Sequence, residues 1–586
     1  MLGRMPPEVL DNIARQLPKV DLKSLTLVSA YLRRVAAPHL WTSIVVFAPD
    51  ESNLDKVDLS KFPRSAIRYA SHLSFSSSFR SNIKERCIHP REGFPWPPWR
   101  SISEPEEYSH TRFGRFCEQA VSILELFKKG QLRSFSWNMG TCIPDQILGT
   151  QGILACLNPS LEALSLTTDA DCVERQPVDM YGEQLSLAPF HNLKRLCWRA
   201  PRREYVVYLD IVLENNAHCL EDFELDMVDW NLFYDYYDTD GLEDELEYGG
   251  LFGIRASLSE SLFLNLSRLS LSQVEVGPGM IHLFNFHVLR SLTLRKCPGW
   301  AKFLDSIQEA ELLLRLKTLE VQDYDSDDGA MRSLYLLCLL EISIGLEELY
   351  LNIDKWPGAL LSLAEISKDQ PTLKRFAQYP TVKDDPKLGK SELLATMERR
   401  DLPNPLGSLD LEAYGLTCNP RFISFLDQKQ TLQSFSTRHT LKVVHIRPVR
   451  GMMEDSYLHP VVAGSSRQSS RSDNYSGRSS GKATHEDTWA SLPLGLRYEF
   501  RPVAKWAFGR QGLASLKLII FGDFAYECRN GRHNFMLCRS SDGQSNFRCL
   551  ARESYEWKAV VEEYRNLLES CPSEPLLKMG YPYNSD

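Results

Sequence analysis

The sequence predicts an α/β protein in which a small three-helix unit precedes a degenerate repeat solenoid, a curved parallel sheet with helices on its outer side. Three observations predict this class. Apolar residues are spaced by three and four over residues 5–41, the strand pattern L-x-x-L-x-L recurs along the chain, and helical stretches separate its copies. The 586 residues exceed the size of a single compact core, so several domains or an extended repeat are expected.

Three short helices form the first predicted element. Leu10, Ile13 and Leu17 lie on one face of a helix that should end at Pro18. Asp21 is a suitable N-cap for the second helix. The apolar residues expected on the second and third helices are Leu22, Leu25, Val28, Leu32 and Val35, and the third helix should run from about Ala30 to Pro38. Such a small unit rarely buries all its apolar faces within itself, so another surface should cover what remains.

The order of these residues resembles the F-box, the helical module by which many eukaryotic proteins bind a Skp-type adaptor of a cullin-based ubiquitin ligase. The family's Leu-Pro, acid and apolar pair are matched by Met5, Pro6, Glu8, Val9 and Leu10, and its later positions by Asp21, Leu22, Val28, Ser29, Leu32, Leu40 and Trp41. The departures are Met5 for Leu, Ser29 for Cys and Leu32 for Trp. The resemblance implies an adaptor-docking surface made of Pro6, Pro7, Glu8, Val9, Leu10, Ile13, Leu22, Leu25 and Val28. The alternative is an ordinary helical cap on the domain that follows.

The segment after the helices is less regular. Residues 42–47, TSIVVF, predict a strand because they are β-branched and apolar. We assign residues 1–46 to the F-box and 47–115 to an irregular entry segment, which contains a proline-rich run and an acidic turn.

A repeated unit occupies residues 116–575. Its strand copies begin at Leu132, Leu161, Leu193, Leu220, Leu266, Leu289, Leu316, Leu346, Leu373 and Leu406, and further members are expected at Leu432 and Leu513. Alternate strand side chains point inward and a returning helix closes each coil, so neighbouring coils stack into one core. The pattern resembles the leucine-rich repeats that commonly follow an F-box, although the usual Asn or Cys after the strand is clear only at Cys297. A generic α/β domain with chance matches is the alternative.

Two insertions and a closing segment complete the organisation. Residues 231–262 are strongly acidic and predict a mobile loop, and residues 464–486 are rich in Ser, Gly and Arg and predict disorder. Residues 513–575 are expected to cap the last coil, ending in a helix from residue 555 that Pro572 stops, and residues 576–586 form a tail.

Composition and motifs exclude several function classes. A net charge of −9 argues against general nucleic-acid binding, and no apolar run is long enough for a membrane span. The 14 cysteines include no C-x-x-C pair, which favours a reducing intracellular location, cytoplasmic and/or nuclear. Cys528, Cys538 and Cys549 are too widely spaced for a zinc site, and we expect no metal, cofactor or catalytic residues.

The predicted function is therefore that of a non-catalytic adaptor. We expect the substrate-recognition subunit of a Skp-cullin-F-box ubiquitin ligase, which binds a Skp-type adaptor, through it a cullin, and an unknown protein target on the curved sheet. The strand residues expected to meet the target are Arg195, Arg199, Arg295, Glu348, Tyr350, Asp410 and Glu412. The alternatives are an F-box and adaptor scaffold that acts without a cullin in assembly or trafficking, and an enzyme hidden in the insertions or the entry segment.

Overall fold

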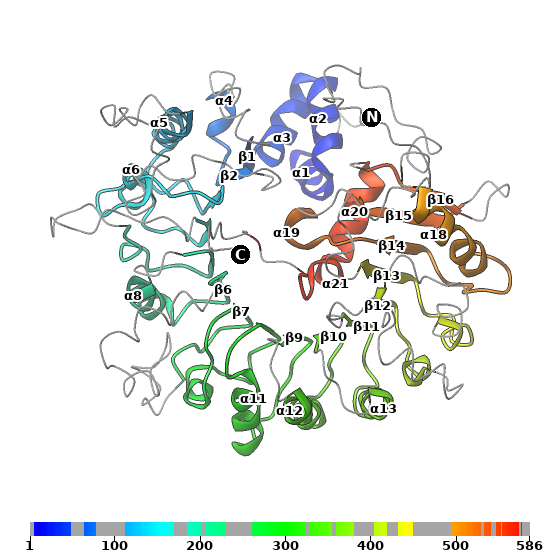
Figure 1. Cartoon of the computed structure of the whole chain (residues 1–586). Helices are drawn as coiled ribbons and strands as arrows, with labels where there is room; N and C mark the ends of the chain where they lie inside the picture. Colours follow the sequence, from blue (N-terminus) through cyan, green and yellow to red (C-terminus); the bar gives the residue numbers. More distant parts are fainter. Residues whose placement is uncertain are drawn as a thin grey trace, which may run out of the picture. The chain divides into compact units, whose positions relative to one another are not determined.

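The chain divides into two compact units in the computed structural model of Figure 1. The model describes residues 5–48, 64–77, 112–168, 185–201, 206–228, 261–323, 329–353, 359–379, 404–418, 432–448, 492, 494–528, 533–540, 547–552, 554–573 and 576. Unit 1 comprises Met1–Leu289 with Leu576–Asp586, and unit 2 comprises Arg290–Pro575.

Unit 1 is built on parallel strands that follow one another in chain order. They are β1 (Ser43–Ala48), β2 (His72–Ser77), β3 (Ser134–Asn138), β4 (Ala163–Thr167), β5 (Arg195–Arg199), β6 (Asp222–Asp226) and β7 (Arg268–Ser272). Its helices are α1 (Pro7–Gln16), α2 (Lys19–Val28), α3 (Ala30–Leu40), α4 (Arg64–Ile67), α5 (Arg112–Leu124), α6 (Asp145–Leu148), α7 (Ile153–Leu157), α8 (Val206–Asn216) and the 3-10 helix η6 (Pro278–Leu283).

Unit 2 continues the same strand–helix alternation and closes with an antiparallel edge. Its strands are β8 (Ser291–Arg295), β9 (Thr318–Gln322), β10 (Glu348–Asn352), β11 (Arg375–Gln378), β12 (Ala413–Cys418), β13 (Val443–Pro448), β14 (Leu518–Phe521), β15 (Phe535–Arg539) and β16 (Phe547–Cys549). Strands β8 to β14 pair in parallel, and β15 and β16 are added antiparallel. Its helices are α11 (Trp300–Glu309), α12 (Gly329–Ile342), α13 (Ala359–Asp369), the 3-10 helix η7 (Pro405–Ser408), α18 (Leu494–Ala507), α19 (Ala525–Cys528), α20 (Tyr555–Glu563) and α21 (Arg565–Glu569).

The recurring L-x-x-L-x-L pattern sets the position of each strand. In every copy from Leu132 to Leu373 the first leucine is buried, and a strand begins two residues after that leucine. In β6, for example, Phe223 and Leu225 point into the core, whereas Asp222 and Glu224 lie on the opposite face and are only half-buried. Since a fully buried leucine contributes about 1.5–3 kcal/mol, this periodicity stabilises each strand. The predicted α/β class with a parallel sheet is confirmed.

Three of the expected strand copies are wrong in their position. The copy at Leu406 contains η7 and a turn, and the strand of that unit is β12, which begins at Ala413. The copy at Leu432 forms helical turns ahead of β13, and the copy at Leu513 forms a turn ahead of β14. Leucines spaced by three fit a helical turn as well as a strand entry, so the pattern alone does not distinguish them.

The entry segment contains more regular structure than its composition indicates. The strand expected over residues 42–47 is confirmed as β1. The segment 47–115 also contributes α4 and β2, and β2 pairs with both β1 and β3. The sequence of β2, HLSFSS, carries three serines and so lacks the apolar signal of its neighbours. Residues 231–260 of the acidic insertion predicted over 231–262, the stretch 464–486 and the tail residues 577–586 lie outside the described residues.

Within each unit, buried amide side chains join one strand–helix repeat to the preceding repeat. Asn216, at the end of α8, accepts a hydrogen bond from the Leu193 amide at 2.7 Å and donates to the carbonyl oxygens of Phe190 at 2.7 Å and Val212 at 2.8 Å. Gln370 makes equivalent bonds to the carbonyl oxygens of Leu340 and Ser343. These amides precede the strand, whereas the Asn expected from the repeat family follows it.

Replacing Asn216 with Ala should therefore destabilise unit 1. The substitution leaves the Leu193 amide and the Phe190 carbonyl buried without this partner. Each such loss costs about 1–3 kcal/mol, so the free energy of unfolding should fall by roughly 2–4 kcal/mol. Urea unfolding at equilibrium measures the change.

The neighbouring residue provides the matched control. Asn215 is more exposed and makes one long bond, of 3.4 Å, to the Ala188 carbonyl oxygen. Asn215→Ala should alter the free energy of unfolding by no more than about 0.5 kcal/mol. If the two substitutions lower the free energy of unfolding equally, the buried amide of Asn216 does not join successive strand–helix repeats.

Candidate functional site

The N-terminal helices begin and end at residues that favour these boundaries. Helix α1 starts with Pro7 in its first position, where the missing N–H is tolerated. Helix α2 starts directly after Pro18, so the prediction that Asp21 caps it is wrong, and Asp21 lies in its first turn instead. Ser29 caps α3 by accepting a hydrogen bond from the Leu32 amide at 3.2 Å. This third helix continues past the expected stop at Pro38 to Leu40.

A small core holds the three helices together. It consists of Ala14, Leu22 and Ala36, with Leu17, Leu25, Val35 and Leu40 packed partly against it. The pairing of α1 with α3 is reinforced outside this core, where the His39 Nε2 atom lies 2.7 Å from an Asp11 carboxylate oxygen. This hydrogen bond is the main reason that the pKa of Asp11 lies below its ordinary value.

A set of large apolar side chains remains exposed on the same helices and just before α1. This exposed apolar set consists of Met5, Val9, Ile13, Val20, Leu27 and Val28. Val9 and Ile13 are four residues apart and so share one face of α1, while Val20 and Leu27 are seven apart and share one face of α2. So many exposed apolar residues on so small a unit indicate a protein-binding surface.

The residues implied by the F-box resemblance fall into two groups. Those exposed are Pro6, Pro7, Glu8, Val9, Ile13 and Val28. Leu25 is half-buried, and Leu10 and Leu22 are buried at 3% exposure each. Sequence reasoning did not include Met5, Val20 and Leu27 in this surface. Val20 and Leu27 lie on the side of α2 away from the core residue Leu22, and Met5 precedes α1.

The predicted target residues of unit 1 lie on one face of its sheet and are paired with acids. Arg199 Nε lies 2.6 Å from a Glu224 carboxylate oxygen, and Arg195 Nε lies 3.0 Å from Asp222. Asp222 is also 3.5 Å from Arg268. Both arginines of β5 are therefore paired with acids of β6 on a polar sheet face.

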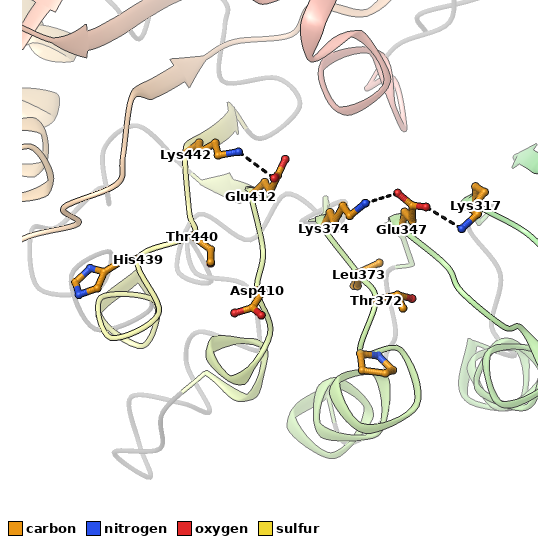
Figure 2. A pocket seen from close by; sticks show the side chains of 11 residues that line it. Lys317, Glu347, Thr372, Leu373, Lys374, Asp410, Glu412, His439, Thr440 and Lys442 are labelled. Atoms are coloured by element: carbon orange, nitrogen blue, oxygen red, sulfur yellow. Dashed lines mark hydrogen bonds and ion pairs between the residues drawn. The ribbon is translucent and has the colours of Figure 1, made fainter.

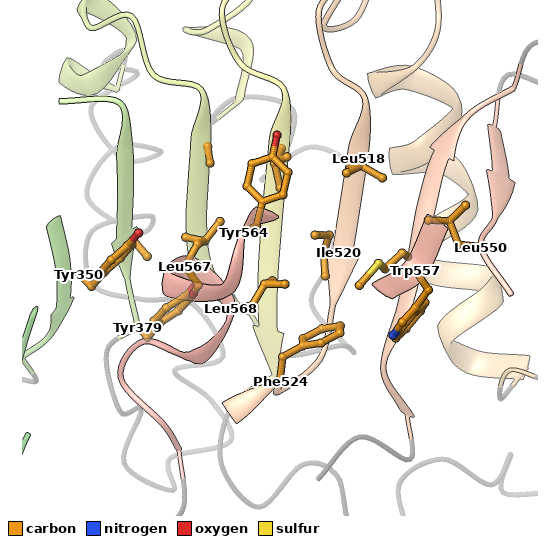
Figure 3. Packing of buried hydrophobic residues seen from close by; sticks show 14 of the residues in the cluster. Tyr350, Tyr379, Leu518, Ile520, Phe524, Leu550, Trp557, Tyr564, Leu567 and Leu568 are labelled. Atoms are coloured by element: carbon orange, nitrogen blue, oxygen red, sulfur yellow. The ribbon is translucent and has the colours of Figure 1, made fainter. Parts of the chain in front are cut away.

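The predicted target residues of strands β8 and β10 lie beneath the C-terminal part of unit 2. Arg295 pairs with Glu320 at 2.6 Å and also donates to the Glu569 carbonyl oxygen at 3.4 Å. Glu348 accepts a hydrogen bond from Asn566 at 2.9 Å. Tyr350 is 1% exposed, and burial raises the pKa of its phenol well above the ordinary value. Figure 3 shows Tyr350 in the cluster that includes Tyr564, Leu567 and Leu568.

The last two predicted target residues, Asp410 and Glu412, line a groove at the N-terminal ends of strands β9 to β13 in unit 2 (Figure 2). They precede β12 and do not lie on the sheet face. The groove has a volume of about 580 Å³, and its charged residues are Lys317, Glu347, Lys374, Asp410, Glu412 and Lys442. Most of these charges form pairs, such as Lys442 with Glu412 at 2.9 Å.

The lysines of the groove neutralise the charges of its glutamates. Glu347 bridges Lys317 at 2.8 Å and Lys374 at 2.7 Å, and the hydrogen bonds from these lysines lower its pKa to about 2. Such exposed pairs contribute little to stability, about 0–1 kcal/mol each. Over the described parts of the chain, His, Cys, Asp and Glu side chains do not gather in threes that would suit a metal ion. Nor do those parts include a helix with the length and apolar character of a membrane span.

Comparison with protein families gives an identity for the N-terminal helices alone. Residues 2–46 match the F-box-like family, the same stretch that contains α1 to α3 and the exposed apolar set. A comparison with curated proteins found no match for the chain. The N-terminal region is therefore F-box-like, and F-box domains generally bind Skp-type adaptors.

Proposed function

We propose that this chain is the substrate-recognition subunit of a Skp-cullin-F-box ubiquitin ligase, with the F-box-like helices as the docking unit for the adaptor. The observation that carries the proposal is the exposure of Val9, Ile13 and Val28 on a unit that matches the F-box-like family. An adaptor that covers these side chains would remove apolar surface from water, which is the main driving force for such association.

The remainder of the chain is proposed to hold the target. The leucine-spaced parallel strands of units 1 and 2 support a sheet of the leucine-rich-repeat type, although strand position departs from the pattern at Leu406, Leu432 and Leu513. Such a subunit breaks no bond itself. It accelerates ubiquitin transfer by holding the target near the enzyme that carries ubiquitin. The two then meet within one complex and not by diffusion from solution. The proposed location is the cell interior, in the cytoplasm and/or the nucleus.

Recovery of a cullin tests the proposal directly. The tagged full chain is expressed together with a Skp-type adaptor and a cullin, and we expect both to co-purify with it. The scaffold alternative predicts that the adaptor is recovered without the cullin, so that result would contradict the ligase proposal. Failure to recover either protein would contradict both roles.

A further inference from the structure

The sheet of unit 2 carries a packed layer on each of its faces. On one face lie α11, α12 and α13, and on the other lie α20 and α21 (Figure 1). We call residues 554–573 the C-terminal segment. It contributes Trp557, Tyr564, Leu567, Leu568 and Cys571 to a buried cluster on this second face. The prediction that this part caps the last coil therefore requires revision, because the segment covers the sheet face and β15 and β16 form the edge.

Many of the strand residues beneath the segment are apolar or small. The cluster includes Ala377 on β11, Ala413 on β12, Val443 on β13 and Ile520 on β14, as Figure 3 shows in part. A glycine, Gly415, leaves room for the Tyr379 ring, which a Cβ atom at this position would meet. In unit 1 the corresponding face carries polar residues such as Ser136 and Ser165. The second face of unit 2 is thus adapted to a ligand with apolar side chains.

Buried polar side chains of the sheet bind the backbone of the segment. Arg447, which is 2% exposed, donates to the carbonyl oxygens of Leu568 at 3.1 Å and Ser570 at 2.7 Å, and also to that of Cys571. Glu320 accepts a hydrogen bond from the Cys571 amide at 2.6 Å. The Gln322 side chain donates to the Pro572 carbonyl oxygen at 3.1 Å. These groups recognise the end of a helix and the turn that follows, where backbone carbonyls lack helical partners.

Additional contacts fix the two ends of the bound stretch. The Asn566 amide donates to Glu348, and Ser573 hydrogen-bonds to Asp523. Arg375 lies over the Tyr564 ring, 5.4 Å from its centroid. Contacts therefore extend from residue 564 to residue 573, the length of a short peptide ligand.

The sheet itself does not depend on the segment for its backbone pairing. Strands β8 to β14 pair with one another, and their other face has its own buried residues, such as Leu319 and Leu349. The segment adds no strand. It is held by side chains that bind its backbone, which is how a protein binds a peptide.

We propose that the second face of unit 2 is a peptide-binding surface whose resident ligand is the chain's own C-terminal segment. The segment leaves and rebinds as one piece, while the sheet stays folded. The ligand class is a short amphipathic helix with aromatic and leucine side chains whose last carbonyls bind Arg447. A target that uses this face must displace the segment, and this last step rests on the proposed function.

Native cysteines report on the release of the segment in the full chain. Cys571 lies near the end of the segment and Cys297 follows β8, and both are fully buried. The probe is iodoacetamide under native conditions, with each alkylated cysteine quantified by mass spectrometry. If the segment opens by itself, Cys571 should react at least about tenfold faster than Cys297, which corresponds to about 1.4 kcal/mol less opening free energy. Equal rates, or a slower reaction at Cys571, would show that the segment is an inseparable part of the core and would overturn the proposal.

Variants of the contacts provide the second measurement. Arg447→Ala removes the carbonyl contacts and should raise the Cys571 rate by about tenfold or more, since charge-assisted bonds are lost. Asn566→Ala removes one contact at an exposed position and should raise the Cys571 rate by a smaller factor. This variant provides the measurement if Arg447→Ala does not fold. Tyr555→Ala, at an exposed residue of α20, should leave the rate unchanged. A Cys571 rate that responds to none of the contact variants would contradict recognition through these side chains. The labelling needs neither adaptor nor target, so its outcome is independent of the ligase proposal.

Discussion

Replacing Val9 and Ile13 together with Asp should abolish binding of a Skp-type adaptor. Both side chains are substantially exposed, 45% for Val9 and 39% for Ile13, and they share one face of α1. The substitutions remove apolar area that the adaptor would bury. They also place two unpaired carboxylates against the partner. We expect the dissociation constant to rise at least about a hundredfold, as for residues at the centre of an interface. Biolayer interferometry with the purified full chain measures it.

A matched substitution outside the F-box-like helices controls for added charge. Leu126 follows α5 and is 40% exposed, close to the value for Ile13. Leu126→Asp should bind the adaptor like the unchanged chain, and circular dichroism melting should be similar for all these variants. Adaptor binding by the Val9 and Ile13 variant at the unchanged affinity would contradict the assignment of this face.

Leu10 would give a less clear test of the same surface. It is 3% exposed and belongs to the interior of the helical unit. Leu10→Ala is expected to destabilise that unit by about 2–5 kcal/mol. Loss of adaptor binding could then follow from unfolding of the helices, so the exposed positions distinguish docking from stability.

The contrast between Leu10 and Val9 shows what the sequence can predict of the site. The order of residues indicated an F-box, and the family comparison supports this for residues 2–46. The spacing did not show which apolar residues face the helical core, because Leu10, Ile13 and Leu17 lie along one side of an isolated helix. In the folded unit, where α1 contacts α3, Leu10 is buried and Ile13 is exposed.

The strands show a similar limit of local patterns. From Leu132 to Leu373 the apolar alternation predicted each strand, because the core on one face requires it. At Leu406 the same spacing produced buried residues within a 3-10 helix and turn, and Leu406, Leu409 and Leu411 are all buried there. Burial was thus predicted correctly, whereas the strand that follows, AYGLTC, has no leucine before its fourth residue.

The C-terminal segment could not be placed from sequence because its contacts are remote. Its helix was expected from the apolar spacing of Trp557, Tyr564 and Leu568, although Tyr564 separates two helices in the structure. The residues that bind its backbone lie 123 positions away for Arg447 with Ser570 and 251 away for Glu320 with Cys571. An Arg or Glu on a strand gives no local sign of such a partner.

Acidic pH should destabilise unit 2 through the buried His445. The His445 Nε2 atom lies 2.9 Å from the Gly522 carbonyl oxygen, which can only accept, so Nε2 carries the proton. In the neutral imidazole the other ring nitrogen, 2.6 Å from the Tyr379 hydroxyl, accepts a hydrogen bond from it. Burial, together with the positive charge of Arg447, lowers the pKa of His445 to about 3, against the smaller opposing effects of the hydrogen bond to Gly522 and the charge of Asp523.

This low pKa makes stability depend on pH between about 3 and 6.5. The unfolded chain protonates His445 near its ordinary pKa of about 6.5. Below that pH the unfolded state binds a proton that the folded state does not, so the free energy of unfolding falls as the pH falls through this window. The contribution is fully present above about pH 6.5 and decreases by about 1.4 kcal/mol per pH unit below it.

Comparison with His445→Gln isolates this contribution. Glutamine can donate and accept hydrogen bonds but does not titrate, so the variant should be less stable at pH 7 yet lose less stability on acidification. Between pH 6.5 and 4.5 we expect the unchanged chain to lose up to about 2.7 kcal/mol more than the variant, measured by urea unfolding at each pH. His439→Gln, at an exposed histidine of the same unit, should keep the steeper dependence. If the pH dependence of His445→Gln runs parallel to that of the unchanged chain, His445 is not the group that couples acid to unfolding.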